Sequence, residues 1–440
     1  MIQQGQPIAQ HDYQRHLDAG LDPPPLSKET VRYWSDFNRV FFHPRSLVQI
    51  QDADLPAGSR GMEKYEVGGE IFDGLDREHD LLDRDLRPFV EECDQMQGLQ
   101  IVAGVDDAWG GFAGRYVERI GDEYAKVPVW VWALEDGRDR TVVCIVLCIL
   151  LFEVFLNGTF VDGKQERRTQ ALLNTTKSLL ALSDIGSLYI SISNIPSRQP
   201  PPYLRLDQYS PWHTSALQMA PVESITLPSR LRRENLSRIT MSDMEATFTT
   251  ENAHQKILHL EYSVKDHFLT GNSVQVNGHV NGTNSDAMDV DSDNDSPEPL
   301  DIDLFPKANS SSSQGTLRRR IHVFSAAEIF RGWYPTHSRT RNAPTGLSPR
   351  KETYSTPDQF PLPSSYPHIF NFSQQSSEGL AIHASVAASS AIADRIRDLA
   401  QMVGRVSDIT EREDIYSSLM GLREEYIEGW EGEDSEWEDD

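Results

Sequence analysis

Apolar and polar positions in the first half of the chain alternate between helical spacing and short apolar runs. Three stretches have helical spacing: 83–97, 112–124 and 165–183. Four apolar runs of strand length lie between or beside them: 46–49, 99–105, 127–134 and 187–193. Helices that alternate with apolar strands predict an α/β fold, in which a parallel sheet is covered by helices on both faces.

Two of the predicted helices have a well-defined apolar stripe. The first stripe consists of Leu82, Leu86, Phe89, Cys93 and Met96. Gly98 follows it, where a left-handed C-cap is expected to end the helix. The second stripe consists of Phe112, Tyr116, Val117, Ile120 and Tyr124. These stripes predict one buried face for each helix.

The second half of the chain has a less regular pattern. Three consecutive prolines, 200–202, mark the change, and 272–313 is rich in Asn, Ser, Gly and Asp with almost no aromatic residues. Such a segment cannot bury enough apolar surface to offset its ordering entropy, so we expect disorder. The run 321–333 predicts a strand and turn, and 382–402 and 411–430 predict helices.

These patterns divide the chain into six parts. We expect a disordered leader (1–27), an N-terminal α/β domain (28–195), a middle region (196–267), a disordered acidic linker (268–318), a C-terminal region (319–427) and an acidic tail (428–440). We expect the later parts to form a second α+β region.

Charge, cysteine content and the first residues of the chain indicate what the protein binds and where it is located. Asp and Glu number 67 against 41 Lys and Arg, a formal net charge of −26, which argues against direct binding of nucleic acid. Three cysteines cannot form a disulfide framework, so a reducing compartment is expected. The first twenty residues lack the apolar core of a secretory signal and the Arg-rich, acid-poor character of a mitochondrial presequence.

One long apolar run lies at 142–156. Glu153 interrupts it, and it is shorter than the roughly 20 residues of a membrane-spanning helix. A buried strand or helix is the favoured interpretation; translated non-coding sequence and membrane contact are the alternatives. We therefore expect at most peripheral membrane contact.

The candidate chemistry lies between the strand at 99–105 and the helix at 112–124. A glycine-rich loop in this position usually binds phosphate through backbone N–H groups and the helix dipole. Gly110, Gly111 and Gly114 are present, but Asp106 and Asp107 stand where phosphates would lie. Two like charges about 4 Å apart cost about 4 kcal/mol at an effective dielectric of 20. The pattern favours a structural capping loop over a nucleotide site.

Other catalytic and metal-binding patterns are missing from the sequence. It contains no P-loop, GxGxxG, GxSxG or HExxH motif. Alternating aspartates at 289–295 lack the glycine and final glutamate of an EF-hand loop, and we interpret them as solvated. We expect no catalytic residues, no metal and no cofactor.

Three blocks resemble the misato family, which includes the fungal mitochondrial DNA inheritance proteins and is similar to tubulin. They are 31–49 (VRYWSDFNRVFFHPRSLVQ), 80–97 (DLLDRDLRPFVEECDQMQ) and 106–114 (DDAWGGFAG). The resemblance implies a tubulin-like fold for 28–195 and 319–427, with the N-terminal strand missing and a foreign segment at 142–163. Tubulin's GGGTGSG loop corresponds to VDDAWGG at 105–111, which keeps only the last glycine and argues against GTP hydrolysis.

The resemblance also implies a role. It suggests a non-enzymatic protein that acts in the distribution of mitochondria and the inheritance of mitochondrial DNA, located at the cytosolic side of mitochondria and in the cytoplasm. Expected partners are proteins, among them tubulin, cytoskeletal or chaperonin components. Two alternatives remain open: a degenerate GTP-binding protein of the tubulin superfamily, and a cofactor of chaperonin-assisted tubulin folding.

Overall fold

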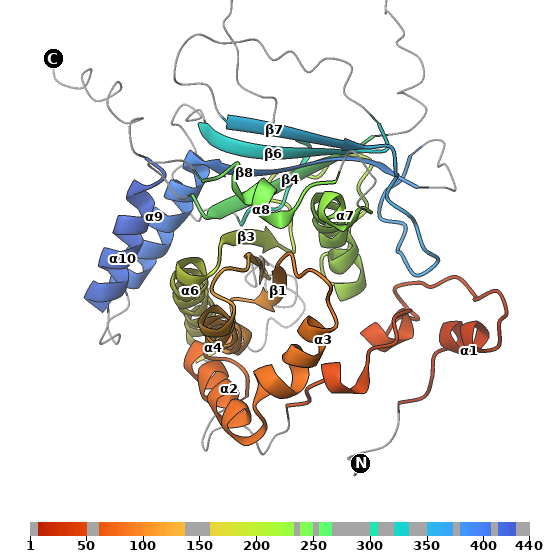
Figure 1. Ribbon diagram of the computed structural model, residues 1–440, viewed down its shortest axis with the longest axis horizontal. Coiled ribbons are helices and arrows are strands. Elements are labelled where there is room, and N and C mark those ends of the chain that lie inside the picture. Colours follow the sequence, from red (N-terminus) through yellow and green to blue (C-terminus); the bar gives the residue numbers. More distant parts are fainter. Residues whose placement is uncertain are drawn as a thin grey trace, which may run out of the picture.

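The computed structural model describes residues 8–50, 61–136, 159–232, 238–249, 255–265, 300–306, 321–333, 350–372, 379–405 and 412–427. Eight strands within these residues form one sheet in the order β1-β2-β3-β4-β8-β6-β7, with β5 paired to β4 (Figure 1). The strands are β1 (Leu99–Gly104), β2 (Val129–Glu135), β3 (Leu188–Ser193), β4 (Ile257–Lys265), β5 (Ile302–Asp303), β6 (Val323–Arg331), β7 (Arg350–Thr356) and β8 (Ala381–Ser389).

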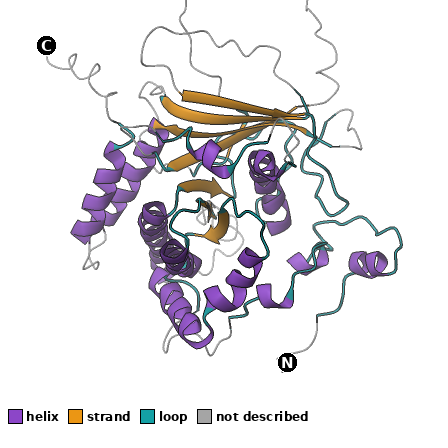
Figure 2. Ribbon diagram, in the orientation of Figure 1, coloured by secondary structure: helices purple, strands orange, loops and turns teal. Residues whose placement is uncertain are grey.

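Helices cover both faces of this sheet (Figure 2). They are α1 (Asp12–Asp18), α2 (Tyr65–His79), α3 (Arg87–Glu91), α4 (Ala108–Glu123), α6 (Thr159–Ile185), α7 (Pro211–Arg230), α8 (Met241–Glu245), α9 (Ser390–Arg405) and α10 (Arg412–Glu424). The helices α4, α6 and α9 contact one face, with α2 packed outside α4 and α10 against α9, whereas α7 lies against the other face.

The predicted α/β fold with helices on both faces is confirmed, but the sheet is mixed rather than wholly parallel. Strands β1 to β4 are parallel, β8 is antiparallel to both β4 and β6, and β6 and β7 are parallel. Buried strands are apolar whichever way their neighbours run, so their sequence pattern does not reveal direction. Because β8 pairs with β4, the N-terminal and C-terminal regions share one continuous sheet.

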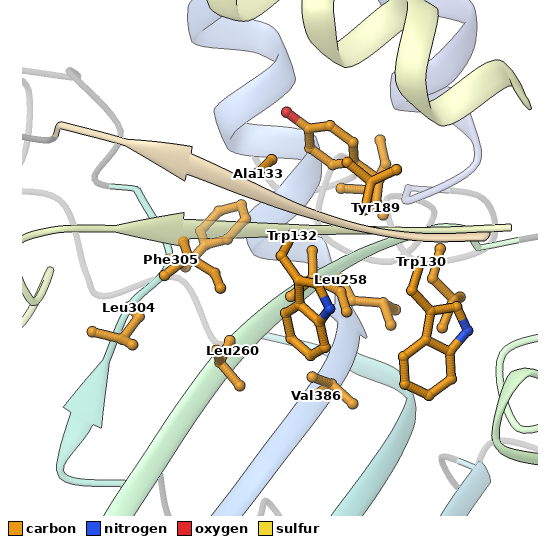
Figure 3. Close-up of a cluster of buried hydrophobic side chains, with 14 of the residues drawn as sticks. Trp130, Trp132, Ala133, Tyr189, Leu258, Leu260, Leu304, Phe305 and Val386 are labelled. Carbon is orange, nitrogen blue, oxygen red and sulfur yellow. The ribbon is translucent and has the colours of Figure 1, made fainter. Parts of the chain in front are cut away.

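The core is built on the aromatic strand β2. Trp130 and Trp132 are 0% and 1% exposed and point to one side of the sheet, together with Leu258 of β4 and Val386 of β8 (Figure 3). Tyr189 points to the opposite side (Figure 3). Strand residues alternate between faces, so β2 contributes side chains to the core on both sides.

Two N-terminal predictions were wrong. Residues 46–49 form no strand, because Pro44 begins a short 3₁₀ turn, Pro44–Ser46, and extended chain follows it. The helix predicted over 83–97 consists of a π-helical turn, Leu82–Leu86, followed by α3, which ends at Glu91. Gly98 is not left-handed; a Cβ there would lie 2.9 Å from the Pro128 carbonyl oxygen, so close packing requires this glycine.

The helix predicted over 382–402 is half strand. Residues 381–389 form β8, and only from Ser390 does the chain become helical, as α9. Alanine favours helices, but here small side chains fit a strand placed between β4 and β6 and buried on both faces. The strand at 321–333 and the last helix are confirmed as β6 and α10.

Two segments expected to be disordered contain ordered residues. Within the leader, α1 forms, and its buried Tyr13 hydroxyl is 2.8 Å from Ser364 Oγ. Within the expected linker, Ile302 and Leu304 are both 0% exposed, because β5 adds to the edge of β4. The rest of the expected linker (268–299 and 307–318), the run 142–156 and the tail 428–440 lie outside the described residues.

None of the helices in the described part of the chain is long and apolar enough to span a membrane.

Candidate functional site

The glycine-rich segment lies where parallel sheets usually bind ligands. It follows β1, and the carboxyl ends of β2 and β3 lie beside it in the parallel sheet. In open α/β sheets, ligands bind in the crevice outside these strand ends. The question is therefore whether 105–114 can accept a phosphate.

The backbone donors at the start of α4 are already occupied. Asp107 is the N-cap, and its Oδ1 accepts a hydrogen bond from Trp109 N at 2.9 Å. The N–H of Ala108 donates to the Met62 carbonyl, and the N–H of Gly110 donates to the Asp107 carbonyl, both at 3.4 Å. A phosphate at this helix N-terminus would have to displace these internal acceptors.

Burial also affects the charge of the cap. It raises the pKa of Asp107, and the nearby charge of Asp106 acts in the same direction, whereas the hydrogen bond from Trp109 opposes the shift. At neutral pH an ionised carboxylate at this position repels a polyanion.

Asp106 has a different role from Asp107. Its Oδ2 accepts a hydrogen bond from Asp136 N at 3.1 Å, just after the end of β2. Its backbone carbonyl accepts from Asn174 Nδ2 of α6 at 3.1 Å. Asp106 therefore joins the ends of two neighbouring strands, while Asp107 caps the helix.

All three glycines lie inside α4, although the sequence pattern had placed Gly110 and Gly111 in the loop before the helix. A Cβ on Gly110 would lie 1.9 Å from Ser178 Oγ of α6, and one on Gly111 would lie 1.8 Å from the Tyr65 carbonyl oxygen of α2. A Cβ on Gly114 would lie 3.0 Å from the Tyr65 hydroxyl. These glycines allow α2 and α6 to approach α4 closely, so their backbone faces neighbouring helices.

Asn174 is a key residue that the sequence reasoning missed. It is 1% exposed, and its Nδ2 donates to the carbonyls of Glu63 at 2.8 Å and Asp106 at 3.1 Å. Its Oδ1 accepts from Tyr65 N at 3.0 Å and Gln170 Nε2 at 2.9 Å. The available signal was a run of polar residues, 174–176, between two apolar pairs, Leu172–Leu173 and Leu179–Leu180.

A buried ion pair at the same edge was also missed. Glu135, the last residue of β2, accepts from Arg395 Nη2 of α9 at 2.7 Å, and both residues are under 9% exposed. Burial raises the pKa of Glu135, the Arg395 charge opposes this, and the Asp106 charge reinforces it. Sequence spacing gave no signal, because the partners are 260 residues apart.

The edge as a whole is acidic. Asp106, Asp107, Glu135 and Asp136 meet there. The Arg395 guanidinium is bound to Glu135, so its charge is already balanced within the protein. No group of three or more His, Cys, Asp or Glu side chains among the described residues is arranged to hold a metal ion. This arrangement suits capping and strand connection, and it disfavours phosphate.

Comparison with known proteins agrees with this description of the fold. The family described as "Tubulin domain" matches residues 23–146. "Protein DML1" of Phaeosphaeria nodorum is 40% identical over 99% of this chain and 81% of that protein. "Protein dml1" of Aspergillus clavatus is 36% identical over 100% of this chain and 81% of that protein.

A more distant match comes from an animal. "Protein misato homolog 1" of Macaca fascicularis is 30% identical over 52% of this chain and 38% of that protein. The resemblance seen in the sequence blocks is thereby confirmed, and the chain belongs to the DML1/misato family of tubulin-like proteins.

Proposed function

We propose that this chain is a non-enzymatic, tubulin-like protein that acts in the distribution of mitochondria and the inheritance of mitochondrial DNA. One observation carries the non-enzymatic part: the donors at the start of α4 are bound to Met62 and Asp107, and the glycines of α4 are packed against α2 and α6. A tubulin domain in this state keeps its surfaces for protein contacts, while the donors that would bind phosphate are bound to the protein's own carbonyl and carboxylate oxygens.

The mitochondrial part of the proposal derives from family membership. We place the protein in the cytoplasm and on the cytosolic side of mitochondria. Its partners in this proposal are proteins, with tubulin, cytoskeletal and chaperonin components as the first candidates. The net charge of −26 supports a protein partner over direct contact with the phosphate backbone of DNA.

A depletion and rescue experiment tests the role. Depleting the protein in its native fungus should lower the ratio of mitochondrial to nuclear DNA, measured by quantitative PCR, and should disturb mitochondrial distribution under the microscope. Re-expression of the parent chain and of an Asp106→Asn, Asp107→Asn variant should both restore the ratio, because neither carboxylate has a catalytic task in this proposal.

Two outcomes would contradict the proposal. An unchanged DNA ratio and unchanged distribution after complete depletion would remove the mitochondrial role. Failure of the Asp106→Asn, Asp107→Asn variant, expressed at the parent's level and with the parent's melting temperature, would indicate that the carboxylates do chemistry. Co-purification with chaperonin subunits, together with lowered tubulin levels after depletion, would favour the tubulin-folding alternative.

A further inference from the structure

The segment between α1 and α2 exposes an unusual number of large apolar side chains. In residues 39–48, here called the apolar loop, Phe41 is 95% exposed and Val40 and Leu47 are each 60% exposed. Phe42 and Val48 are 49% and 40% exposed. Scattered exposed apolar residues are ordinary, but five within nine positions mark an interaction surface.

The apolar loop is held in place by contacts just before the exposed residues and at His43, which lies among them. The ring of Phe37 lies 6.3 Å from that of Trp212, and the ring of His43 lies 5.6 Å from that of Phe89. The side chain of Gln14 in α1 donates to the Asn38 carbonyl at 2.6 Å. The loop lies at the periphery of the molecule, away from the sheet (Figure 1). The apolar side chains are therefore presented outward by an anchored backbone.

Charge distinguishes this surface from the rest of the protein. Neither Arg39 nor Arg45, the two arginines of the apolar loop, forms an ion pair with another residue in the described part of the chain. Arg39 Nη1 donates a hydrogen bond to the neutral Ser364 Oγ at 3.4 Å, which leaves its charge unbalanced. Three nearby acids are paired internally: Asp36 with Arg32 at 3.0 Å, Asp83 with Arg87 at 2.6 Å, and Asp85 with Arg84 at 2.7 Å. In a chain of net charge −26, the apolar loop itself thus carries two arginines and no acidic residue.

We propose that the apolar loop is a membrane-docking site that inserts Phe41 and its apolar neighbours into a bilayer containing anionic lipids. In that position Arg39 and Arg45 would contact lipid phosphates at the headgroup level. Apolar side chains flanked by basic ones are the combination that binds at this interface. A bilayer accepts a protruding phenylalanine without a matching pocket, whereas a protein interface requires shape complementarity.

The proposal deepens the proposed function by naming a surface through which the protein would contact a mitochondrial membrane. The two proposals are tested by separate measurements: vesicle binding tests the membrane-docking site, and mitochondrial DNA content tests the proposed function. If one measurement gives the expected result and the other does not, the result shows which proposal has failed.

Vesicle co-sedimentation of the full chain tests the docking site. The parent should bind vesicles of equimolar phosphatidylcholine and phosphatidylglycerol, and bind vesicles of phosphatidylcholine alone more weakly. Phe41→Asp should lower the partition into the mixed vesicles by about tenfold or more, since a buried phenylalanine is lost from the interface. Arg39→Glu with Arg45→Glu should lower it by a similar factor and reduce its salt dependence.

A matched control is available on another face. Tyr416 of α10 is an aromatic residue that is 43% exposed, and Tyr416→Asp should leave vesicle binding unchanged. All variants should keep the parent's circular dichroism and melting temperature. Equal binding by Phe41→Asp and the parent, or equal loss in Tyr416→Asp, would overturn the proposal. The proposal would also be overturned if the parent chain did not bind vesicles at all. In that case, loss of self-association or of a protein partner in Phe41→Asp would assign the apolar loop to a protein interface.

Discussion

Arg395 of α9 and Glu135 at the end of β2 form a buried ion pair, with 2.7 Å between Nη2 and Oε2. The pair joins a C-terminal helix to the carboxyl edge of the N-terminal strands. Buried charges are costly to remove from water, and each partner here compensates the other. The N-terminal and C-terminal parts of the fold are therefore coupled at the carboxyl edge of the parallel strands.

Arg395→Met should destabilise the protein by about 3–5 kcal/mol, because Glu135 would stay buried without its partner. Burial already raises the pKa of Glu135 above its ordinary 4.5, and loss of Arg395 would raise this pKa further. When a carboxyl group has a higher pKa in the folded protein than in the unfolded chain, its full contribution to stability is present at a pH below the unfolded-state pKa. That contribution is lost as the pH rises through the folded-state pKa. Urea denaturation should therefore show that Arg395→Met lowers the free energy of unfolding, relative to the parent, by more at pH 8 than at pH 5.

The control for this prediction is an exposed pair in α4. Arg115 pairs with Glu118 at 2.9 Å and with Asp73 at 3.8 Å, and all three side chains are more than 40% exposed. Arg115→Met should cost less than about 1 kcal/mol and add no comparable pH dependence. Equal effects of the two substitutions would contradict the importance of the buried pair.

Gly111→Ala should destabilise the protein by about 2 kcal/mol or more. The added Cβ would lie 1.8 Å from the Tyr65 carbonyl, and backbone must move to relieve the clash. Gly74→Ala in α2 is the matched control, because a Cβ there meets nothing within 4 Å. That change should stabilise the protein by about 0.5–1 kcal/mol. Thermal denaturation separates the two; a stabilising Gly111→Ala would refute the packing role.

Asp107→Ala should cost about 1 kcal/mol, since the Trp109 N–H loses its acceptor. Asp107→Asn keeps an acceptor and should cost far less. Because burial raises the pKa of Asp107 above its ordinary 3.8, its ionisation destabilises the fold as pH rises through the folded value. The asparagine variant should therefore lose less stability than the parent between pH 3 and pH 7. Equal losses for the asparagine and alanine variants would argue against capping.

Asn174→Ala should destabilise the protein by about 2–3 kcal/mol, because four hydrogen-bonding groups on three segments lose their partner. Asn174→Asp should be at least as harmful, since a carboxylate oxygen would face the Glu63 and Asp106 carbonyls. Amide hydrogen exchange at Tyr65 should accelerate in both variants. Unchanged exchange there would show that Asn174 does not hold this junction.

Local patterns along the chain were enough to predict much of the fold. Continuous apolar runs gave β1, β2 and β3, and the stripe through Val117 and Ile120 gave the buried face of α4. The order and direction of strands were not predictable, since β8 reaches β4 only through long-range packing. Alanines 384, 387 and 388 carry a helical propensity that burial in the sheet overrides.

The candidate site was predicted in part. The sequence placed Asp106 and Asp107 correctly before a helix, but it put Gly110 and Gly111 in the preceding loop. Glycines in a loop and glycines at a helix crossing are identical in sequence, and only the neighbours in space distinguish them. Asn174 and Arg395 were not predictable for the same reason, because their partners lie far away along the chain.

The central claim is that residues 105–114 serve capping and helix packing rather than nucleotide binding. Isothermal titration calorimetry of the purified chain with GTP and Mg²⁺ tests it most directly, with an Asp106→Ala, Asp107→Ala variant in parallel. We predict no saturable heat for the parent. Binding by the variant alone would show that the carboxylates exclude phosphate. Saturable binding by the parent, with a Kd below about 100 μM, would contradict the account.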